Sequence, residues 1–234
     1  MDPHEELPAS AADEPTTVLE WAWERFAPSI AMTSSFQTQS VPLLHMISVV
    51  APRMPVLFLD TGFHFSETLA FRDQLVERFG LNLHVLEPRM GHDGFLREHG
   101  ELYRRDPDLC CHINKVDPLR RAMAGLEAWV SGIRRDQTPE RRDTPVVGRE
   151  RDGLLKICPL AGWSQDAVDR YMEEHDLPRH PLHGCGYMSI GCAPCTRRVR
   201  AGEDPRAGRW PNSDKKECGL HFDGFGGPEG GSNG

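Results

Sequence analysis

The fold is decided by the stretch Val56-Leu57-Phe58-Leu59-Asp60-Thr61-Gly62. Four consecutive apolar residues predict a short buried strand, and the polar residues that follow mark the point where it ends. The next segment, Phe65 to Phe79, carries apolar residues near one face and is followed by Gly80, which predicts a helix with a glycine stop. Apolar residues then alternate between Leu81 and Val85, which predicts another strand.

The alternation of strands and helices extends in both directions from this stretch. We expect helices over 18–26, 41–50 and from an N-cap at Ser164 to about His175, and strands over 30–33, 129–133 and 154–157. Strands that alternate with helices predict an α/β fold, in which a parallel sheet has helices on both faces.

Polar residues follow several of these strands at the point where each ends. They are Ser34-Ser35, Asp60-Thr61-Gly62 and Gly132-Ile133-Arg134-Arg135. Ligands of parallel sheets bind beyond the carboxyl ends of the strands, near the point where the strand order reverses. We therefore expect these three segments to converge on one crevice.

Composition excludes several classes of function. The chain has 234 residues and a formal net charge of −8, which argues against broad nucleic-acid binding. It contains no run of 18 apolar residues, so no membrane span is expected. The first 15 residues are acidic and lack the apolar core of a secretory signal, so we expect a cytoplasmic protein. There, seven cysteines indicate metal binding or catalysis rather than disulfides.

Two cysteine pairs, Cys110-Cys111 and Cys192-Ala193-Pro194-Cys195, predict a metal centre. Thiolates suit zinc or an iron–sulfur cluster, and the spacing does not decide between them, although an adjacent pair is less typical of zinc. Cys158 ends an apolar strand and is expected in the core. Cys185, between two glycines, is assigned no role.

A separate thiol, Cys218, lies in Glu217-Cys218-Gly219-Leu220-His221 and is a candidate nucleophile. The preceding Lys215-Lys216 would lower its pKa. Guanidinium groups bind phosphate and sulfate oxygens bidentately, so basic clusters on an acidic chain suit a small anionic ligand, although a solvated surface is the alternative. One cluster holds Arg134, Arg135, Arg141 and Arg142, and the other holds Arg197, Arg198, Arg200, Arg206 and Arg209.

These features together resemble the assimilatory sulfonucleotide reductases, and in particular their cluster-bearing branch that acts on adenosine 5′-phosphosulfate (APS). The resemblance runs from about Ser34 to His221. Its motifs are Leu57-Phe58-Leu59-Asp60-Thr61-Gly62, Cys110-Cys111 with Lys115, Gly132-Ile133-Arg134-Arg135-Asp136-Gln137, Gly191-Cys192-Ala193-Pro194-Cys195-Thr196-Arg197, Gly202-Glu203-Asp204-Pro205-Arg206-Ala207-Gly208-Arg209-Trp210 and the segment around Cys218.

The resemblance implies a fold and a set of site residues. The fold would be adenine-nucleotide α-hydrolase-like, the four paired cysteines would hold a [4Fe-4S] cluster, and Cys218 would be the nucleophile on a mobile C-terminal segment. The residues that match substrate-binding positions of the family are Ser34, Ser35, Leu59, Lys115, Gly132, Arg134, Arg141, Arg206, Arg209 and His221. The family's arginine after the Gly132-Ile133-Arg134-Arg135 motif could match Arg141 or Arg142, because the intervening loop varies in length; Arg141 is the residue chosen.

The chain is accordingly divided into four parts. We expect a disordered tail over 1–16, a nucleotide- and cluster-binding α/β domain over 17–200, the segment with the nucleophile over 201–222 and a flexible glycine-rich tail over 223–234.

The implied reaction is the thioredoxin-dependent reduction of APS to sulfite and AMP through a cysteine S-sulfonate, in sulfate assimilation and cysteine biosynthesis. The partners would be APS and reduced thioredoxin, with no nucleic acid or membrane and with a possible homo-oligomer. The nearest alternative is the same reaction on the 3′-phosphorylated nucleotide (PAPS), or on both nucleotides.

Two readings from other classes are weaker. A sulfur-inserting RNA-modifying enzyme on this fold would need ATP, but related ATP-cleaving enzymes carry Ser-Gly-Gly-x-Asp-Ser where this chain has Ser34-Ser35-Phe36-Gln37-Thr38-Gln39-Ser40. A non-enzymatic iron–sulfur sensor would need neither the segment around Cys218 nor the two arginine clusters.

Overall fold

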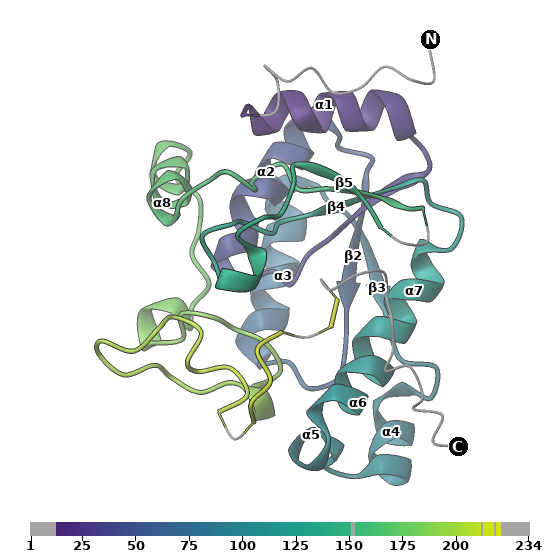
Figure 1. Cartoon of the computed structure of the whole chain (residues 1–234), viewed down its shortest axis with the longest axis vertical. Helices are drawn as coiled ribbons and strands as arrows, with labels where there is room; N and C mark the ends of the chain where they lie inside the picture. The colour runs from purple at the N-terminus through teal and green to yellow at the C-terminus, as the bar shows by residue number, and fades with distance from the viewer. Residues whose placement is uncertain (1–12, 151–152, 212, 218, 221–234) are drawn as a thin grey trace.

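A six-stranded sheet forms the centre of the computed structural model, which describes residues 13–150, 153–211, 213–217 and 219–220. The strand order is β3-β2-β1-β4-β6-β5 (Figure 1). The strands are β1 Ile30–Thr33, β2 Pro55–Leu59, β3 Asn82–Leu86, β4 Ala128–Ser131, β5 Val147–Arg149 and β6 Leu155–Ile157. All neighbouring pairs are parallel except β5 and β6, which are antiparallel. The predicted α/β class is confirmed.

Strand β1 is the centre of the topology because it pairs with β2 on one side and with β4 on the other. Met32 lies opposite Val56 in one ladder and opposite Val130 in the other. The chain therefore proceeds outward from β1 to β3, returns, and continues on the other side with β4. This reversal of strand order opens a crevice at the carboxyl ends of β1 and β4.

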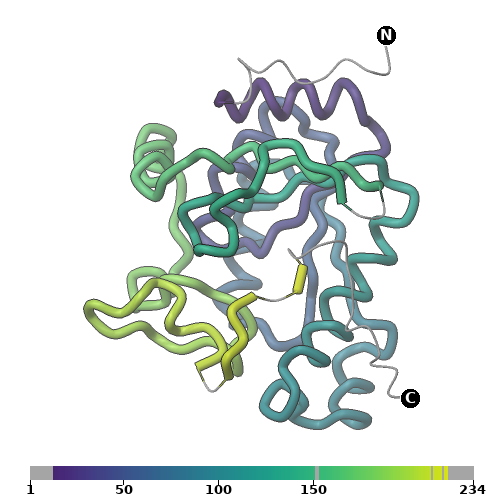
Figure 2. Tube along the Cα trace, viewed as in Figure 1, coloured from purple at the N-terminus to yellow at the C-terminus, as the bar shows by residue number. Residues whose placement is uncertain are grey.

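Helices cover both faces of the sheet (Figures 1 and 2). One hydrophobic cluster joins alternate strand residues such as Met32, Phe58 and Val130 to α1, α2, α3 and α8. A second cluster joins the opposite face, including Leu57 and Trp129, to α7. The helices are α1 Pro15–Phe26, α2 Val41–Val50, α3 Ser66–Phe79, α4 Gly91–His99, α5 Leu102–Arg105, α6 Pro107–Cys111, α7 Asp117–Met123 and α8 Gln165–Glu174.

Local sequence signals explain several of the helix ends. Gly80 has a φ of 63° and caps α3 in the left-handed conformation that glycine adopts at low cost. The hydroxyl of Ser164 accepts a hydrogen bond from the backbone N–H of Ala167 (3.2 Å), so the predicted N-cap of α8 is confirmed. The first helix begins at Pro15 rather than at residue 18, because proline is well tolerated in the first turn.

The segment from 178 to 211 has little regular secondary structure but still contributes to the core. In this part of the described chain only short 3₁₀ turns form, at His183–Cys185 and Ala193–Cys195. Cys192, Cys195 and Trp210 are nevertheless buried together and pack against Phe63 and Tyr103. Figure 2 shows this segment, coloured green to yellow, beside the carboxyl-end edge of the sheet.

Among the described residues, the structure contains no helix with the length and apolar character needed to cross a membrane.

The two ends of α2 provide a test of the core. Leu44 is fully buried in the main cluster, whereas Val49 on the same helix is 67% exposed. We expect Leu44→Ala to lower the free energy of unfolding by about 2–5 kcal/mol, because it leaves a cavity. Val49→Ala is the matched control and should change it by less than about 0.5 kcal/mol. Urea denaturation measures both, and equal effects would show that this helix does not pack as described.

Candidate active site

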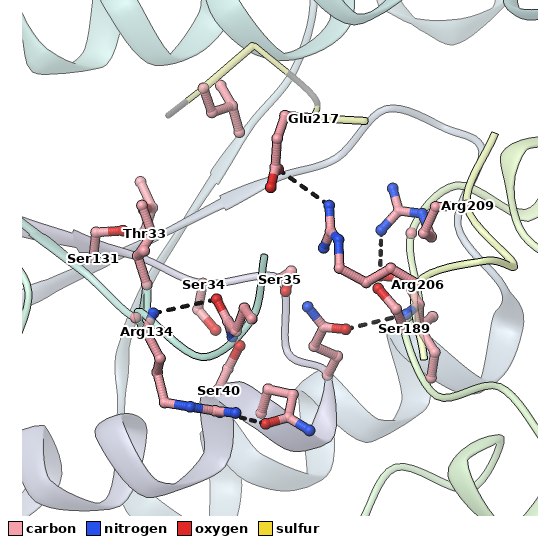
Figure 3. Close-up of a pocket in the computed structure, with 18 of the residues that line it drawn as sticks. Thr33, Ser34, Ser35, Ser40, Ser131, Arg134, Ser189, Arg206, Arg209 and Glu217 are labelled. Atoms are coloured by element: carbon pink, nitrogen blue, oxygen red, sulfur yellow. Dashed lines mark hydrogen bonds and ion pairs between the residues drawn. The ribbon is translucent and has the colours of Figure 1, made fainter. Parts of the chain in front are cut away.

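A cavity of about 350 Å³ lies at the carboxyl ends of the central strands (Figure 3). Ser34 and Ser35 follow β1, Gly132 follows β4, and Leu59 ends β2. Two of the three segments that were expected to converge, Ser34-Ser35 and the one that begins at Gly132, do so. The third, Asp60-Thr61-Gly62, contributes no residue to this cavity, although Leu59 directly before it does. The cavity is of the size that small-molecule sites commonly have.

The loop after β1 is shaped by its own hydrogen bonds. The backbone N–H of Ser34 donates to the carbonyl of Leu57 (3.0 Å), and the Ser34 hydroxyl accepts from the N–H of Phe36 (3.1 Å). Phe36 has a φ of 52°, an uncommon conformation for a non-glycine residue, and its buried ring packs edge-to-face against Phe58. This packing holds the loop so that Ser35 reaches the cavity.

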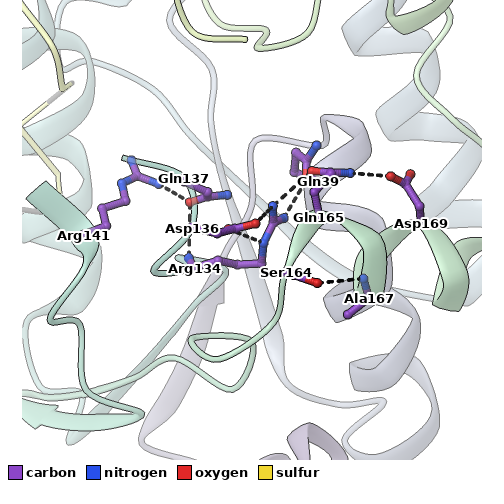
Figure 4. Close-up of polar contacts among 9 residues, drawn as sticks. All are labelled: Gln39, Arg134, Asp136, Gln137, Arg141, Ser164, Gln165, Ala167 and Asp169. Atoms are coloured by element: carbon purple, nitrogen blue, oxygen red, sulfur yellow. Dashed lines mark hydrogen bonds and ion pairs between the residues drawn. The ribbon is translucent and has the colours of Figure 1, made fainter. Parts of the chain in front are cut away.

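Arg134 belongs to the cavity wall, but its guanidinium is fully engaged by the protein (Figure 4). It pairs with the Asp136 carboxylate through Nε (3.0 Å) and Nη2 (3.3 Å). Its other contacts are the side-chain carbonyls of Gln39 (2.5 Å) and Gln165 (3.1 Å). The side chain is 3% exposed. Arg134, which was predicted from the sequence to bind substrate, thus joins the loops after β1 and β4 to α8.

Arg209 lies flat against the backbone on the other side of the cavity. Its Nη1 donates to the carbonyl of Ile190 (3.3 Å), its guanidinium carbon is 4.4 Å from the centre of the Trp210 ring, and its Nε is buried without a hydrogen-bond partner. A Cβ atom at Gly191 would come within 2.3 Å of Nη2, so only glycine leaves room for this guanidinium. An unpaired buried N–H next to the cavity suits an anionic ligand.

Glu217, which the sequence reasoning did not single out, also lines the cavity. Its carboxylate accepts from Arg141 Nε (2.9 Å) and Nη2 (2.6 Å) and lies 3.1 Å from Arg206 Nη2. The structure thereby brings both arginines to the cavity, whereas Arg142 is exposed and does not line it.

His64 is a further cavity residue that sequence reasoning missed. It lies 2.8 Å, through Nε2, from the carbonyl of Leu59 at the end of β2. Burial lowers the pKa of His64, so the ring is neutral at pH 7 and donates from Nε2. The sequence does not indicate that His64 lines the cavity, because a single histidine after a turn has no distinguishing spacing.

The four paired cysteines surround a second, smaller pocket. Cys110 and Cys111 are the last two residues of α6. Cys192 directly precedes the 3₁₀ turn Ala193–Cys195, and Cys195 ends it. All four cysteines are buried. Lys115, Cys192 and Trp210 line this pocket as well as the larger cavity. The two sites therefore share a wall.

Local backbone structure positions the cysteine pair on α6. Residues His112–Val116 form a π-helical turn, a feature common at functional sites. Within it the buried Asn114 donates from Nδ2 to the carbonyl of Cys110 (2.9 Å) and lies 3.7 Å from its sulfur. Thr61 Oγ1 lies 3.3 Å from the sulfur of Cys192. Such donors to sulfur are typical partners of metal-binding thiolates.

The four thiols form a donor set that an iron–sulfur cluster would fit. Burial, and after it the charges of the other three cysteines, raises the pKa of Cys110 to about 12, and burial likewise raises that of Cys195 to about 11. Thiolates in this pocket need a cationic group, which a cluster with four cysteine ligands supplies.

The remaining predicted residues are placed as follows. Cys218 and His221 lie outside the residues that the structure describes. Cys158 is buried in the core, as expected, and Cys185 is exposed.

Comparisons with known proteins agree with this geometry. Residues 29–198 match the family described as phosphoadenosine phosphosulfate reductase domain. A protein of Streptomyces coelicolor named adenosine 5′-phosphosulfate reductase is 47% identical, over 87% of this chain and 86% of the relative. One of Gloeobacter violaceus named phosphoadenosine 5′-phosphosulfate reductase is 45% identical, over 88% of each. The solved phosphoadenylyl-sulfate reductase of Candida auris has a TM-score of 0.70 at 29% identity, over 83% of this chain and 98% of that one.

The role of Arg134 can be tested through stability. Arg134→Met would leave the side-chain carbonyls of Gln39 and Gln165 without their donor and Asp136 without its partner, so we expect the free energy of unfolding to fall by about 1–3 kcal/mol. Arg135→Met is the neighbouring control, because Arg135 is exposed and donates to the carbonyl of Thr144; its effect should stay below about 1 kcal/mol. If both variants unfold at the same urea concentration as the unmodified protein, Arg134 does not tie these loops together.

Proposed function

The chain belongs to the phosphoadenosine phosphosulfate reductase family and is an oxidoreductase, and on this premise we propose that it reduces APS to sulfite and AMP with electrons from reduced thioredoxin. The observation that carries the proposal is the wall that the cavity and the four-cysteine pocket share through Lys115, Cys192 and Trp210. A nucleotide-sized cavity lined by cations and joined to a thiol-rich pocket suits a phosphosulfate group.

Substrate binding uses the ends of the central strands. The adenosine lies against Ser34, Ser35, Leu59 and Gly132, which border the crevice. The phosphosulfate faces Lys115, Arg206 and Arg209, whose positive charges stabilise the charge that develops on the leaving phosphate. Arg134 and Arg141 support this surface from behind: Asp136 binds the guanidinium of Arg134, and Glu217 binds that of Arg141 bidentately while it also pairs with Arg206.

The chemistry begins at Cys218. Its thiolate attacks the sulfur of APS, an S–S bond forms, the S–O bond to the phosphate breaks, and AMP leaves with the electron pair of that bond. His221, three residues after Cys218 in the sequence, would bind the transferring group. A thioredoxin thiolate then attacks the Cys218 sulfur and releases sulfite, and the second thioredoxin thiol resolves the mixed disulfide. The two electrons come from the two thiols, which end as a disulfide.

Cys110, Cys111, Cys192 and Cys195 would hold a [4Fe-4S] cluster. When bound, the cluster would organise the shared wall and tune its electrostatic potential, and neither of the two steps needs an electron from it. Free thiols and reduced thioredoxin both belong to a reducing compartment, so we place the reaction in the cytoplasm, in assimilatory sulfate reduction.

The second candidate substrate is PAPS. The relative from Gloeobacter violaceus, named for that substrate, is almost as similar as the relative named for APS. Comparing sulfite release from the two nucleotides under identical conditions decides between them.

The nucleophile is tested with Cys218→Ser. We expect this variant to keep its iron and its cluster absorbance but to release no sulfite, because a serine hydroxyl at neutral pH is a far weaker nucleophile than a thiolate. Iron content and sulfite release are measured on the same anaerobic sample. Turnover at the unmodified rate would remove Cys218 from the mechanism.

The cluster ligands are tested with Cys195→Ser. We expect iron and activity to be lost together, since a neutral hydroxyl replaces one of four thiolate ligands. Cys185→Ser is the matched control, because Cys185 is exposed and does not line the four-cysteine pocket. Full iron content in the Cys195 variant would refute the ligand assignment.

A further inference from the structure

A buried carboxylate occupies a cavity whose other charged groups are suited to anions. The side chain of Glu217 is 2% exposed, and its two oxygens face the guanidinium groups of Arg141 and Arg206. Arg141 makes two parallel hydrogen bonds to it, of 2.9 and 2.6 Å, the bidentate geometry in which arginine binds carboxylates most strongly. The bidentate ion pair between Arg141 and Glu217, hereafter called the anchor, therefore fixes the position of the Glu217 side chain.

The anchor is connected to the sheet by a chain of hydrogen bonds. The side-chain carbonyl of Gln137 accepts from Arg141 Nη1 and from the backbone N–H of Arg134 (3.2 Å), just beyond β4. Arg134 is in turn fixed by Asp136. Glu217 is therefore linked through Arg141 and Gln137 to the loop after β4, and Figure 4 shows the part of this chain that runs from Arg141 to Arg134.

The chain on either side of Cys218 is attached at several further points. Before it, the carbonyl of Lys216 accepts from Arg206 (3.0 Å), and Lys215 pairs with Asp108 on α6. After it, Leu220 packs against the apolar cluster beside α7, and Gly219 lies next to Val116. Cys218 is bonded directly to Glu217, so the anchor closest to the thiol is the carboxylate between the two arginines.

We propose that Glu217 is a positioning residue, which uses its ion pairs with Arg141 and Arg206 to hold the peptide of Cys218 where the thiolate can attack the sulfur of the substrate. Two guanidinium groups against one carboxylate leave a net positive charge, so the arrangement still attracts an anionic nucleotide. The proposal rests on the proposed function, because it assumes that Cys218 is the nucleophile.

The test compares Glu217→Gln with a matched control, Glu203→Gln. Glu203 also pairs with an arginine, Arg197 (2.7 Å), but it does not line the cavity. Glu217→Asp keeps the charge on a shorter side chain. Arg141→Lys removes the bidentate contact from the opposite side, and it answers the same question if Glu217→Gln does not fold.

Two readouts are taken on cluster-loaded protein. The first is the release of AMP in a single turnover without thioredoxin, which reports the attack by Cys218. The second is the rate at which iodoacetamide alkylates Cys218 across a range of pH, with the exposed Cys185 as internal reference. A changed thiol pKa moves this profile along the pH axis, whereas a displaced segment changes the plateau rate at high pH.

We expect Glu217→Gln and Arg141→Lys to slow single-turnover AMP release by about 100-fold, the scale of a misplacement of roughly 1 Å, with iron content unchanged. Both should raise the alkylation plateau of Cys218 but not that of Cys185, and Glu217→Asp should lie in between. Glu203→Gln should match the unmodified protein.

Each contrary result has a distinct meaning. An unchanged rate of AMP release and an unchanged plateau in Glu217→Gln and Arg141→Lys overturn the inference, as does an equal slowing in Glu203→Gln. Faster AMP release in Glu217→Gln also overturns it, because the carboxylate would then compete with the substrate. If the unmodified protein releases no AMP, the proposed function fails, and the alkylation plateau alone decides whether Glu217 anchors the segment.

Discussion

The parallel pairing of β1 with both β2 and β4 is the constraint on which the rest of the structure depends. Because the strand order reverses at β1, the loops after β1 and β4 separate and leave a crevice between them. Both loops are then held in place by Arg134, whose buried charge is neutralised within the same region. The sheet provides the crevice, and this polar network gives the crevice its shape.

The second element of the site, the cysteine pocket, depends on segments that are far apart in the sequence. Cys110 and Cys111 come from the end of α6, and Cys192 and Cys195 come from a segment without regular helices or strands. The shared residues Lys115, Cys192 and Trp210 join this pocket to the crevice. The four-cysteine pocket and the crevice therefore have part of their walls in common.

Much of this architecture could be predicted from the sequence, since the strands β1, β2 and β3 and the helices α2 and α3 have clear apolar patterns and stop signals. Strand β5 could not, because three residues with a central glycine give no periodicity. The sequence also indicated the two cysteine pairs and most of the cavity arginines as candidate site residues, from their residue type and spacing. The engagement of Arg134 by Asp136 and the burial of Glu217 were not, because both follow from contacts that only the folded chain creates.

The close contact between Gly191 and the Arg209 guanidinium limits how this protein can vary. Even a methyl group at that position would push the cation away from Ile190 while leaving the sheet and the core untouched. We therefore expect such changes to alter the cavity wall more than the stability of the protein. Anyone who redesigns this enzyme for other nucleotides should hold that glycine fixed and diversify the opposite rim.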